Sequence, residues 1–125
     1  MEAKVAIVLQ AGTDNDEGLA RAFHSMVYAK DLRERGAEVR LIFDGAGTQW
    51  PVQFHHPHIE QAKELASLME ELRSQGVAYA ICDYCSNAFG VRDDLKAHGE
   101  PLVAEYMDHP SIANLVADGY QILIL

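Results

Sequence analysis

Two cysteines separated by two residues are the part of the sequence best suited to chemistry. The segment Cys82-Asp83-Tyr84-Cys85 directly follows an apolar run of residues. A thiol at the start of a helix lies near free main-chain N–H groups, which favour the thiolate, the nucleophilic form. A second thiol three residues later can resolve a mixed disulfide or form a reversible one. The segment therefore indicates thiol chemistry. The alternative is that Cys82 is only a small buried hydrophobic residue, and the carboxylate of Asp83 would disfavour a thiolate.

Three histidines within four residues form the second candidate site, His55-His56-Pro57-His58. Imidazoles this close together can share a transition metal ion. The thiols of Cys82 and Cys85 with one or two of these imidazoles would complete a tetrahedral zinc site. The alternative is a polar loop that leads into a helix and binds nothing.

The third candidate is the loop at residues 12–18, Gly-Thr-Asp-Asn-Asp-Glu-Gly. It lacks the Gly-Lys-Ser/Thr ending of a phosphate-binding loop, and its acidic residues would repel phosphate. Its spacing does not match that of a calcium-binding loop. We interpret it mainly as a helix cap made by Asp14 and Glu17, with a ligand-binding role as the alternative.

One local pattern recurs at three places and indicates how the chain is organised. A helical stretch ends, a glycine follows, and a short apolar run begins, at Gly36, Gly76 and Gly119. Glycine at such a point can adopt the left-handed conformation that closes a helix. The run after it is typical of a buried strand.

The pattern predicts a regular alternation of strands and helices. We expect strands over residues 4–9, 37–43, 77–82, 102–105 and 120–125. We expect helices over residues 17–35, 58–75, 92–98 and 111–118. The first helix is expected to present one apolar face, made of Leu19, Phe23, Met26 and Val27. This alternation favours an α/β fold, a three-layer α/β/α arrangement with a mostly parallel five-stranded sheet in flavodoxin-like order.

Such a sheet also predicts where ligands bind. Open parallel sheets bind them at the C-terminal ends of their strands. Three segments qualify: residues 10–16, residues 44–57 and the segment that begins at Cys82. We expect the thiols and the histidine loop to emerge at the same edge of the sheet.

Composition limits the class of protein. A chain of 125 residues fits one domain, residues 1–125, and 49% hydrophobic residues are enough for a core without disulfides or metals. A net charge of -9 with scattered Lys and Arg argues against nucleic acid as the partner. No run approaches the ~20 apolar residues of a membrane span, and the start lacks the pattern of a secretion signal. We therefore expect a cytoplasmic protein with no membrane partner and with reduced thiols.

The order of these motifs resembles the DsrE/DsrF-like family of small sulfur-relay proteins over nearly the whole chain. A strand at 5–9 leads into a Gly-Thr-Asp loop, and Leu-Ile-Phe-Asp-Gly follows a helix and its closing glycine at 41–45. Members often place a cysteine at a strand end, eight residues before Gly-Val, as Cys82 stands before Gly90-Val91. Some add a second cysteine three residues later, as Cys85 does.

The resemblance implies a flavodoxin-like fold, a homo-oligomer that is often a trimer or hexamer, and no organic cofactor. It implies a sulfurtransferase-like sulfur carrier that works between donor and acceptor proteins, with Cys82 accepting sulfur as a persulfide and Cys85 available to resolve it. Ser86 and the N–H groups after Cys82 would stabilise the anionic sulfur. The histidine loop departs from the relay members. The alternative is therefore a non-catalytic metal- or small-ligand-binding module that holds zinc at Cys82, Cys85, His55, His56 and His58.

Overall fold

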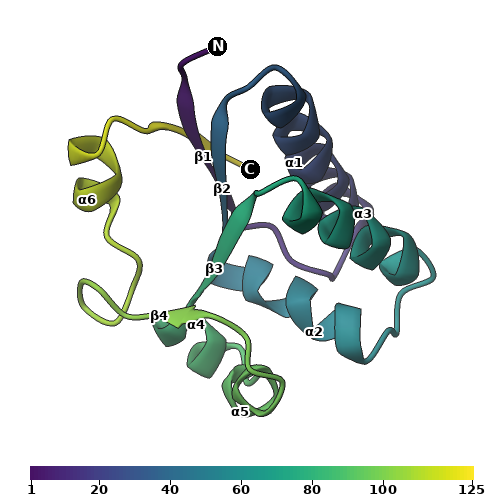
Figure 1. Cartoon of the computed structure of the whole chain (residues 1–125). Coiled ribbons are helices and arrows are strands. Elements are labelled where there is room, and N and C mark those ends of the chain that lie inside the picture. Colours follow the sequence, from purple (N-terminus) through teal and green to yellow (C-terminus); the bar gives the residue numbers. More distant parts are fainter.

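A computed structural model describes residues 1–125 as one parallel sheet covered by helices (Figure 1). The strands are β1 (Lys4–Leu9), β2 (Glu38–Phe43), β3 (Ala78–Cys82), β4 (Leu102–Val103) and β5 (Gln121–Ile124). The helices are α1 (Asp16–Glu34), α2 (Gln49–His55), α3 (Ala62–Ser74), α4 (Asp83–Ala88), α5 (Arg92–Ala97) and α6 (Ile112–Ala117), with a 3-10 turn η1 (Gly45–Thr48). This confirms the predicted α/β class and the five-stranded sheet.

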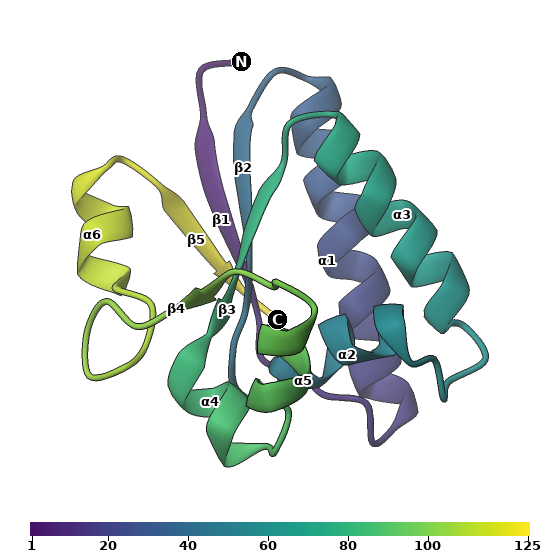
Figure 2. The ribbon, with the colours of Figure 1, turned by 60° about the horizontal axis from the view of Figure 1, so that its bottom comes forward.

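All strand pairs are parallel, and the strand order is β4-β3-β2-β1-β5. The chain runs outward from β1 to β4, and only its last crossover returns to place β5 on the other side of β1. Because right-handed crossovers put their helices on a face set by the direction of travel, α6 lies opposite α1 and α3 (Figure 2). The flavodoxin-like class is confirmed, although this order departs from the 2-1-3-4-5 order of flavodoxin itself.

The two faces of the sheet are covered unequally. Alternate residues of β1 and β2 point to the α1 and α3 side, where a cluster of 17 buried residues forms the main core. The opposite face holds a cluster of only 5, namely Ala6, Val8, Ile42, Leu115 and Tyr120. One short helix, α6, covers this second face, and a hollow of about 130 Å³ remains over β2 and β3. The second face is therefore only thinly covered by the chain itself.

The three predicted helix-closing glycines behave alike. Gly36, Gly76 and Gly119 have φ angles of 90°, 90° and 89°, in the left-handed region. In each case the next residue donates its N–H to a carbonyl in the last helical turn, as Val77 does to Leu72 at 3.0 Å. These bonds satisfy carbonyls that a helix end would leave unpaired, and they turn the chain from helix to strand within two residues.

Several local expectations were wrong. Asn15, rather than the pair Asp14 and Glu17, caps α1 by accepting the N–H of Gly18 at 2.8 Å. The segment after β2, expected to be a loop, contains η1 and α2, and the following helix begins at Ala62 rather than at residue 58. The face that α1 buries includes Ala22, Ser25, Met26 and Ala29, whereas Val27 is 49% exposed.

None of the helices is both long enough and apolar enough to cross a membrane.

Candidate functional site: two thiols and an imidazole

Cys82 lies where β3 ends and α4 begins. The residue is fully buried, and in the sheet it pairs with Val103 of β4. Its sulfur accepts the main-chain N–H of Cys85 at 3.4 Å, so one of the N–H contacts expected at this helix start is present. The hydroxyl of Ser86 donates instead to the carbonyl oxygen of Cys82 at 2.7 Å. Ser86 therefore fixes the turn and does not reach the sulfur.

Cys85 stands one helical turn later and is half-buried. Its thiol contacts Oδ1 of Asp44, the residue after β2, at 3.6 Å. Gln10, which follows β1, donates to the other carboxylate oxygen of Asp44 at 3.0 Å. Both cysteines are free thiols, and their sulfur atoms lie within 4.8 Å of each other. The ends of three neighbouring strands thus meet at the thiol pair, as the predicted sheet requires.

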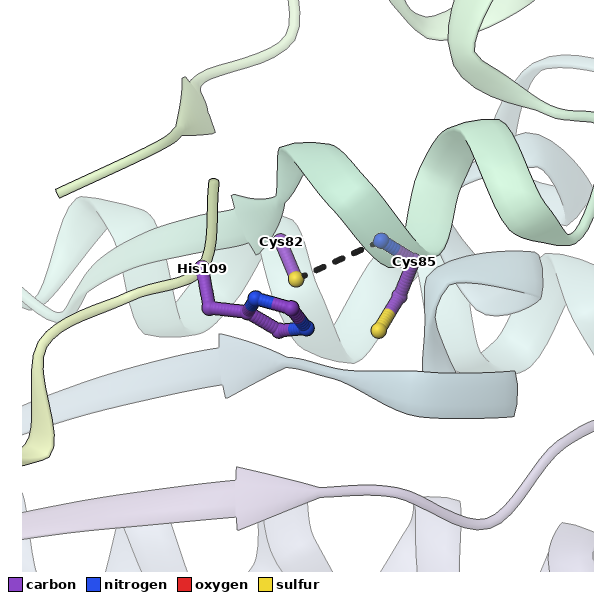
Figure 3. A group of neighbouring side chains, drawn as sticks. All are labelled: Cys82, Cys85 and His109. Atoms are coloured by element: carbon purple, nitrogen blue, oxygen red, sulfur yellow. Dashed lines mark hydrogen bonds between the residues drawn. The ribbon is translucent and has the colours of Figure 1, made fainter. Parts of the chain in front are cut away.

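His109 completes the site, and the sequence analysis did not identify it. One of its ring nitrogens lies within 4.8 Å of both sulfur atoms, and Figure 3 shows the ring edge facing them. The ring stacks on Tyr84 at 4.7 Å between centroids, and its Nδ1 lies 2.6 Å from the carbonyl oxygen of Met107. Because that contact requires a proton on Nδ1, the neutral ring keeps a lone pair on Nε2.

A tight turn brings His109 into place. Tyr106 and His109 form an antiparallel bridge, and the two residues between them, Met107 and Asp108, have φ angles of 47° and 62°. Two successive positive φ angles are typical of a type I′ turn. The carbonyl of Asp108 accepts the N–H of Tyr84 at 2.9 Å, which fastens the turn to the first residues of α4.

Burial dominates the ionisation of Cys82. It raises the pKa of this thiol to about 12, while the N–H of Cys85 lowers the pKa by less and the thiol of Cys85 and the carboxylate of Asp44 raise it further. The thiol is therefore protonated at neutral pH, and the start of a six-residue helix does not reverse this. Chemistry at Cys82 near pH 7 requires a nearby group that takes its proton.

The charged neighbours of the segment pair with each other. Arg92 donates from Nε to Oδ1 of Asp83 at 2.7 Å, so its guanidinium is not directed at a thiolate. A shallow cavity of about 260 Å³ lies beside this pair, lined by Asp83, Tyr84, Asn87, Arg92 and Asp108. Tyr84 and Asp108 belong both to the cavity wall and to the support of His109, so the cavity lies next to the thiol site.

The structure does not bring the three predicted histidines to the thiols. His55 ends α2, His56 follows it, and His58 is exposed. No group of neighbouring metal-ligand atoms contains both a thiol and one of these imidazoles. The imidazole near Cys82 and Cys85 is that of His109, and His56 instead belongs to a second group with Asp94 and His98.

Comparison with known proteins supports the family resemblance. The family model described as the DsrE/DsrF-like family matches residues 3–125. A curated relative, the uncharacterized protein MJ0733 of Methanocaldococcus jannaschii, is 23% identical over 111 residues, which cover 89% of this chain and 85% of the relative.

Two solved structures share the fold. The ychN protein from E. coli superimposes with a TM-score of 0.68 and 17% identity, covering the whole of both chains. The conserved protein BT1422 of unknown function from Bacteroides thetaiotaomicron gives a TM-score of 0.64 and 18% identity, covering 98% of this chain and 94% of the other. At these identities the likeness concerns the fold alone.

Proposed function

Because this chain belongs to the DsrE/DsrF-like family, we propose that it is an intracellular sulfur carrier and that Cys82 accepts the sulfur atom as a persulfide. The observation that supports this most is the grouping of a buried thiol with a second thiol and an imidazole nitrogen, all within 4.8 Å of one another. Burial of Cys82 restricts access and favours a small terminal sulfur atom over a bulky electrophile.

The proposed transfer moves one sulfur atom without net oxidation. Nε2 of His109 takes the proton of Cys82, and the thiolate attacks the outer sulfur of a donor persulfide, R–S–SH. The S–S bond of the donor breaks, R–S⁻ leaves, and it takes the proton back from His109. The products are Cys82–S–SH and R–SH, so the atoms and electrons balance. The imidazole meets the need set by the raised pKa of Cys82.

The persulfide on Cys82 can lose its outer sulfur atom by two routes. An acceptor protein can remove the terminal sulfur from Cys82. Alternatively, the thiol of Cys85 attacks the inner sulfur of the Cys82 persulfide, which forms a Cys82–Cys85 disulfide and releases sulfide. Since the two sulfur atoms already lie within 4.8 Å, only a small movement is needed. The thiol of Cys85 must leave its contact with Asp44 to make this attack.

Intact-mass measurement tests the proposal. The reduced parent, treated with a persulfide donor, is expected to gain one sulfur atom that a reductant removes. Cys82→Ser is expected to gain none, because the accepting atom is missing. Cys85→Ser is the matched control: it should load like the parent and keep the sulfur longer, because the disulfide route is closed. Equal loading of Cys82→Ser and the parent, with both folded by circular dichroism, would refute the proposal.

One observation favours a second function, a metal-binding module. Cys82, Cys85 and His109 together offer two sulfur atoms and one nitrogen, a ligand set suited to zinc. Zinc at this position would occupy the sulfur of Cys82 and block its loading. Near-stoichiometric zinc in untagged protein, released only when the thiols are modified, would favour this module over sulfur transfer.

We also propose that the chain forms a homo-oligomer, a trimer or hexamer, that meets sulfur donor and acceptor proteins in the cytoplasm. The thin cover of the second sheet face supports self-association, because α6 and β5 leave three apolar side chains exposed on this side: Ile112, Val116 and Ile124. Val116→Asp is expected to shift the mass in sedimentation equilibrium toward the monomer, while Val27→Asp on α1 should not. A parent that sediments as a monomer at micromolar concentration would contradict the assembly.

A further inference from the structure

A second cluster of metal-ligand groups lies apart from the thiols. His56 is the residue that caps the C-terminal end of α2, Asp94 lies in α5, and His98 caps the C-terminal end of α5. One atom from each of these side chains lies within 4.8 Å of the other two. Two imidazoles and a carboxylate are a ligand set that binds zinc and similar divalent transition ions.

The spacing between His56 and Asp94 suits a bound ion better than direct pairing. Nε2 of His56 lies 3.2 Å from Oδ2 of Asp94. Nδ1 of His98 donates to the main-chain carbonyl oxygen of Asp94 at 2.9 Å, so the neutral ring keeps its lone pair on Nε2, the atom that would bind an ion. Charge-assisted hydrogen bonds are shorter, about 2.7–2.9 Å. Two ligand atoms that each lie about 2.0–2.1 Å from a tetrahedral zinc ion are about 3.3 Å apart. Nε2 of His56 and Oδ2 of Asp94 are thus separated as two ligands of one ion are.

An unsatisfied oxygen supports the same conclusion. Oδ1 of Asp94 is buried and has no hydrogen-bond partner. Leaving a buried carboxylate oxygen unpaired is costly unless it is compensated. The adjacent pair behaves differently, because His55 and Glu100 form an ordinary hydrogen bond of 2.7 Å. A cation bound at Asp94 would compensate this oxygen.

The surroundings hold the ligands in place. The ring of His55 stacks on that of His98 with 4.1 Å between centroids. Its Nε2 is held by Glu100, which also accepts the hydroxyl of Tyr79 at 2.5 Å. His55 therefore acts as a support that fixes the plane of the His98 ring, in the way that neighbouring groups orient metal-bound histidines.

We propose that His56, Asp94 and His98 bind a divalent transition ion, zinc or a close relative, that fastens α2 to α5. The remaining coordination positions face solvent, since the side chain of His56 is 52% exposed. This site is independent of the sulfur-carrier function: it uses neither thiol, and it lies in the crossovers that follow β2 and β3.

Calorimetric titration of the untagged protein with zinc chloride tests the site. The titration is done on a variant with both Cys82 and Cys85 replaced by serine, so that thiols cannot bind the metal. We expect one zinc ion per chain and a rise in melting temperature. His98→Ala in that background should weaken zinc binding at least tenfold. His58→Ala replaces a histidine two residues after His56 that lies outside the group, and this variant should bind zinc as tightly as the background.

A second readout does not depend on variants. In the parent protein, nitrogen-detected NMR of the imidazole rings should show zinc-dependent shifts for His56 and His98 and none for His24 and His58. Absence of zinc binding in the thiol-free background would overturn the site. So would His98→Ala and Asp94→Asn variants that fold and bind zinc as tightly as that background. Loss of the sulfur-carrier activity would leave both readouts unaffected.

Discussion

Replacing Trp50 with alanine is expected to lower the free energy of unfolding by about 3–5 kcal/mol, the usual cost of removing a large buried aromatic side chain. Trp50 is fully buried in the main core at the start of α2. Its Nε1 also donates to the carbonyl of Ala11 at 2.9 Å, which joins the segment after β2 to the segment after β1. The variant therefore loses packing and a contact between two of the segments that surround the thiol site.

Urea denaturation followed by circular dichroism measures this effect. Tyr28→Ala is the matched control, because Tyr28 is also aromatic but is 41% exposed on α1. Its unfolding free energy should change by only about 0.5 kcal/mol, as is usual for surface substitutions. If the two variants were equally stable, Trp50 would not be the packing element that the structure describes.

Replacing His109 with alanine is expected to slow sulfur loading of Cys82 about 100-fold at pH 7, the usual contribution of a general base. The pKa of Cys82 is raised to about 12 by burial, so below that pH the thiol holds its proton. Without the imidazole, the rate depends on the small thiolate fraction, which grows about tenfold with each pH unit. The defect should therefore shrink as the pH rises from 7 toward 10.

Stopped-flow loading with a persulfide donor, measured across this pH range, gives the test. His24→Ala removes an exposed imidazole from α1 and should leave the profile of the parent unchanged. Equal rates for His109→Ala and the parent at pH 7 would show that another group accepts the proton. That result would remove His109 from the mechanism but would leave Cys82 as the sulfur-accepting residue.

The position of Cys82 in the fold could be predicted because it depends on local signals. Gly76 marks the end of one helix, the apolar run after it marks a buried strand, and Cys82 stands at the end of that strand. The rule that parallel sheets bind ligands at the C-terminal ends of their strands then makes this edge the candidate site. The structure adds Asp44 and Gln10 at that edge, and both follow strands that were predicted correctly.

His109 could not be predicted in the same way, because a turn without the usual sequence signal positions it. Type I′ turns favour Asn and Gly, and here Met107 and Asp108 occupy the two left-handed positions. The link from Asp108 to Tyr84 joins residues whose proximity exists only in the folded chain. A single sequence gives no pattern for such a contact.

Two further differences have packing causes. Val27 was expected in the core, yet α1 approaches the sheet through smaller residues such as Ala22 and Ala29, and this turns Val27 toward solvent. The thiolate expected at the start of α4 is opposed by the burial of Cys82, which only the three-dimensional structure reveals. For Val27, the close packing of α1 on the sheet outweighs the local pattern of apolar residues. For Cys82, burial away from solvent outweighs the effect of the helix start.

The pairing of β1 with β5 also shapes how the chain reaches its native state. Val5 pairs with Gln121, so this contact closes a loop that contains nearly the whole chain. Closing so long a loop costs conformational entropy, and folds rich in such distant contacts assemble slowly. The strands β1, β2 and β3, by contrast, join through short crossovers. The end of β3 that carries Cys82 can therefore fold before β5 pairs with β1 and α6 docks on the sheet.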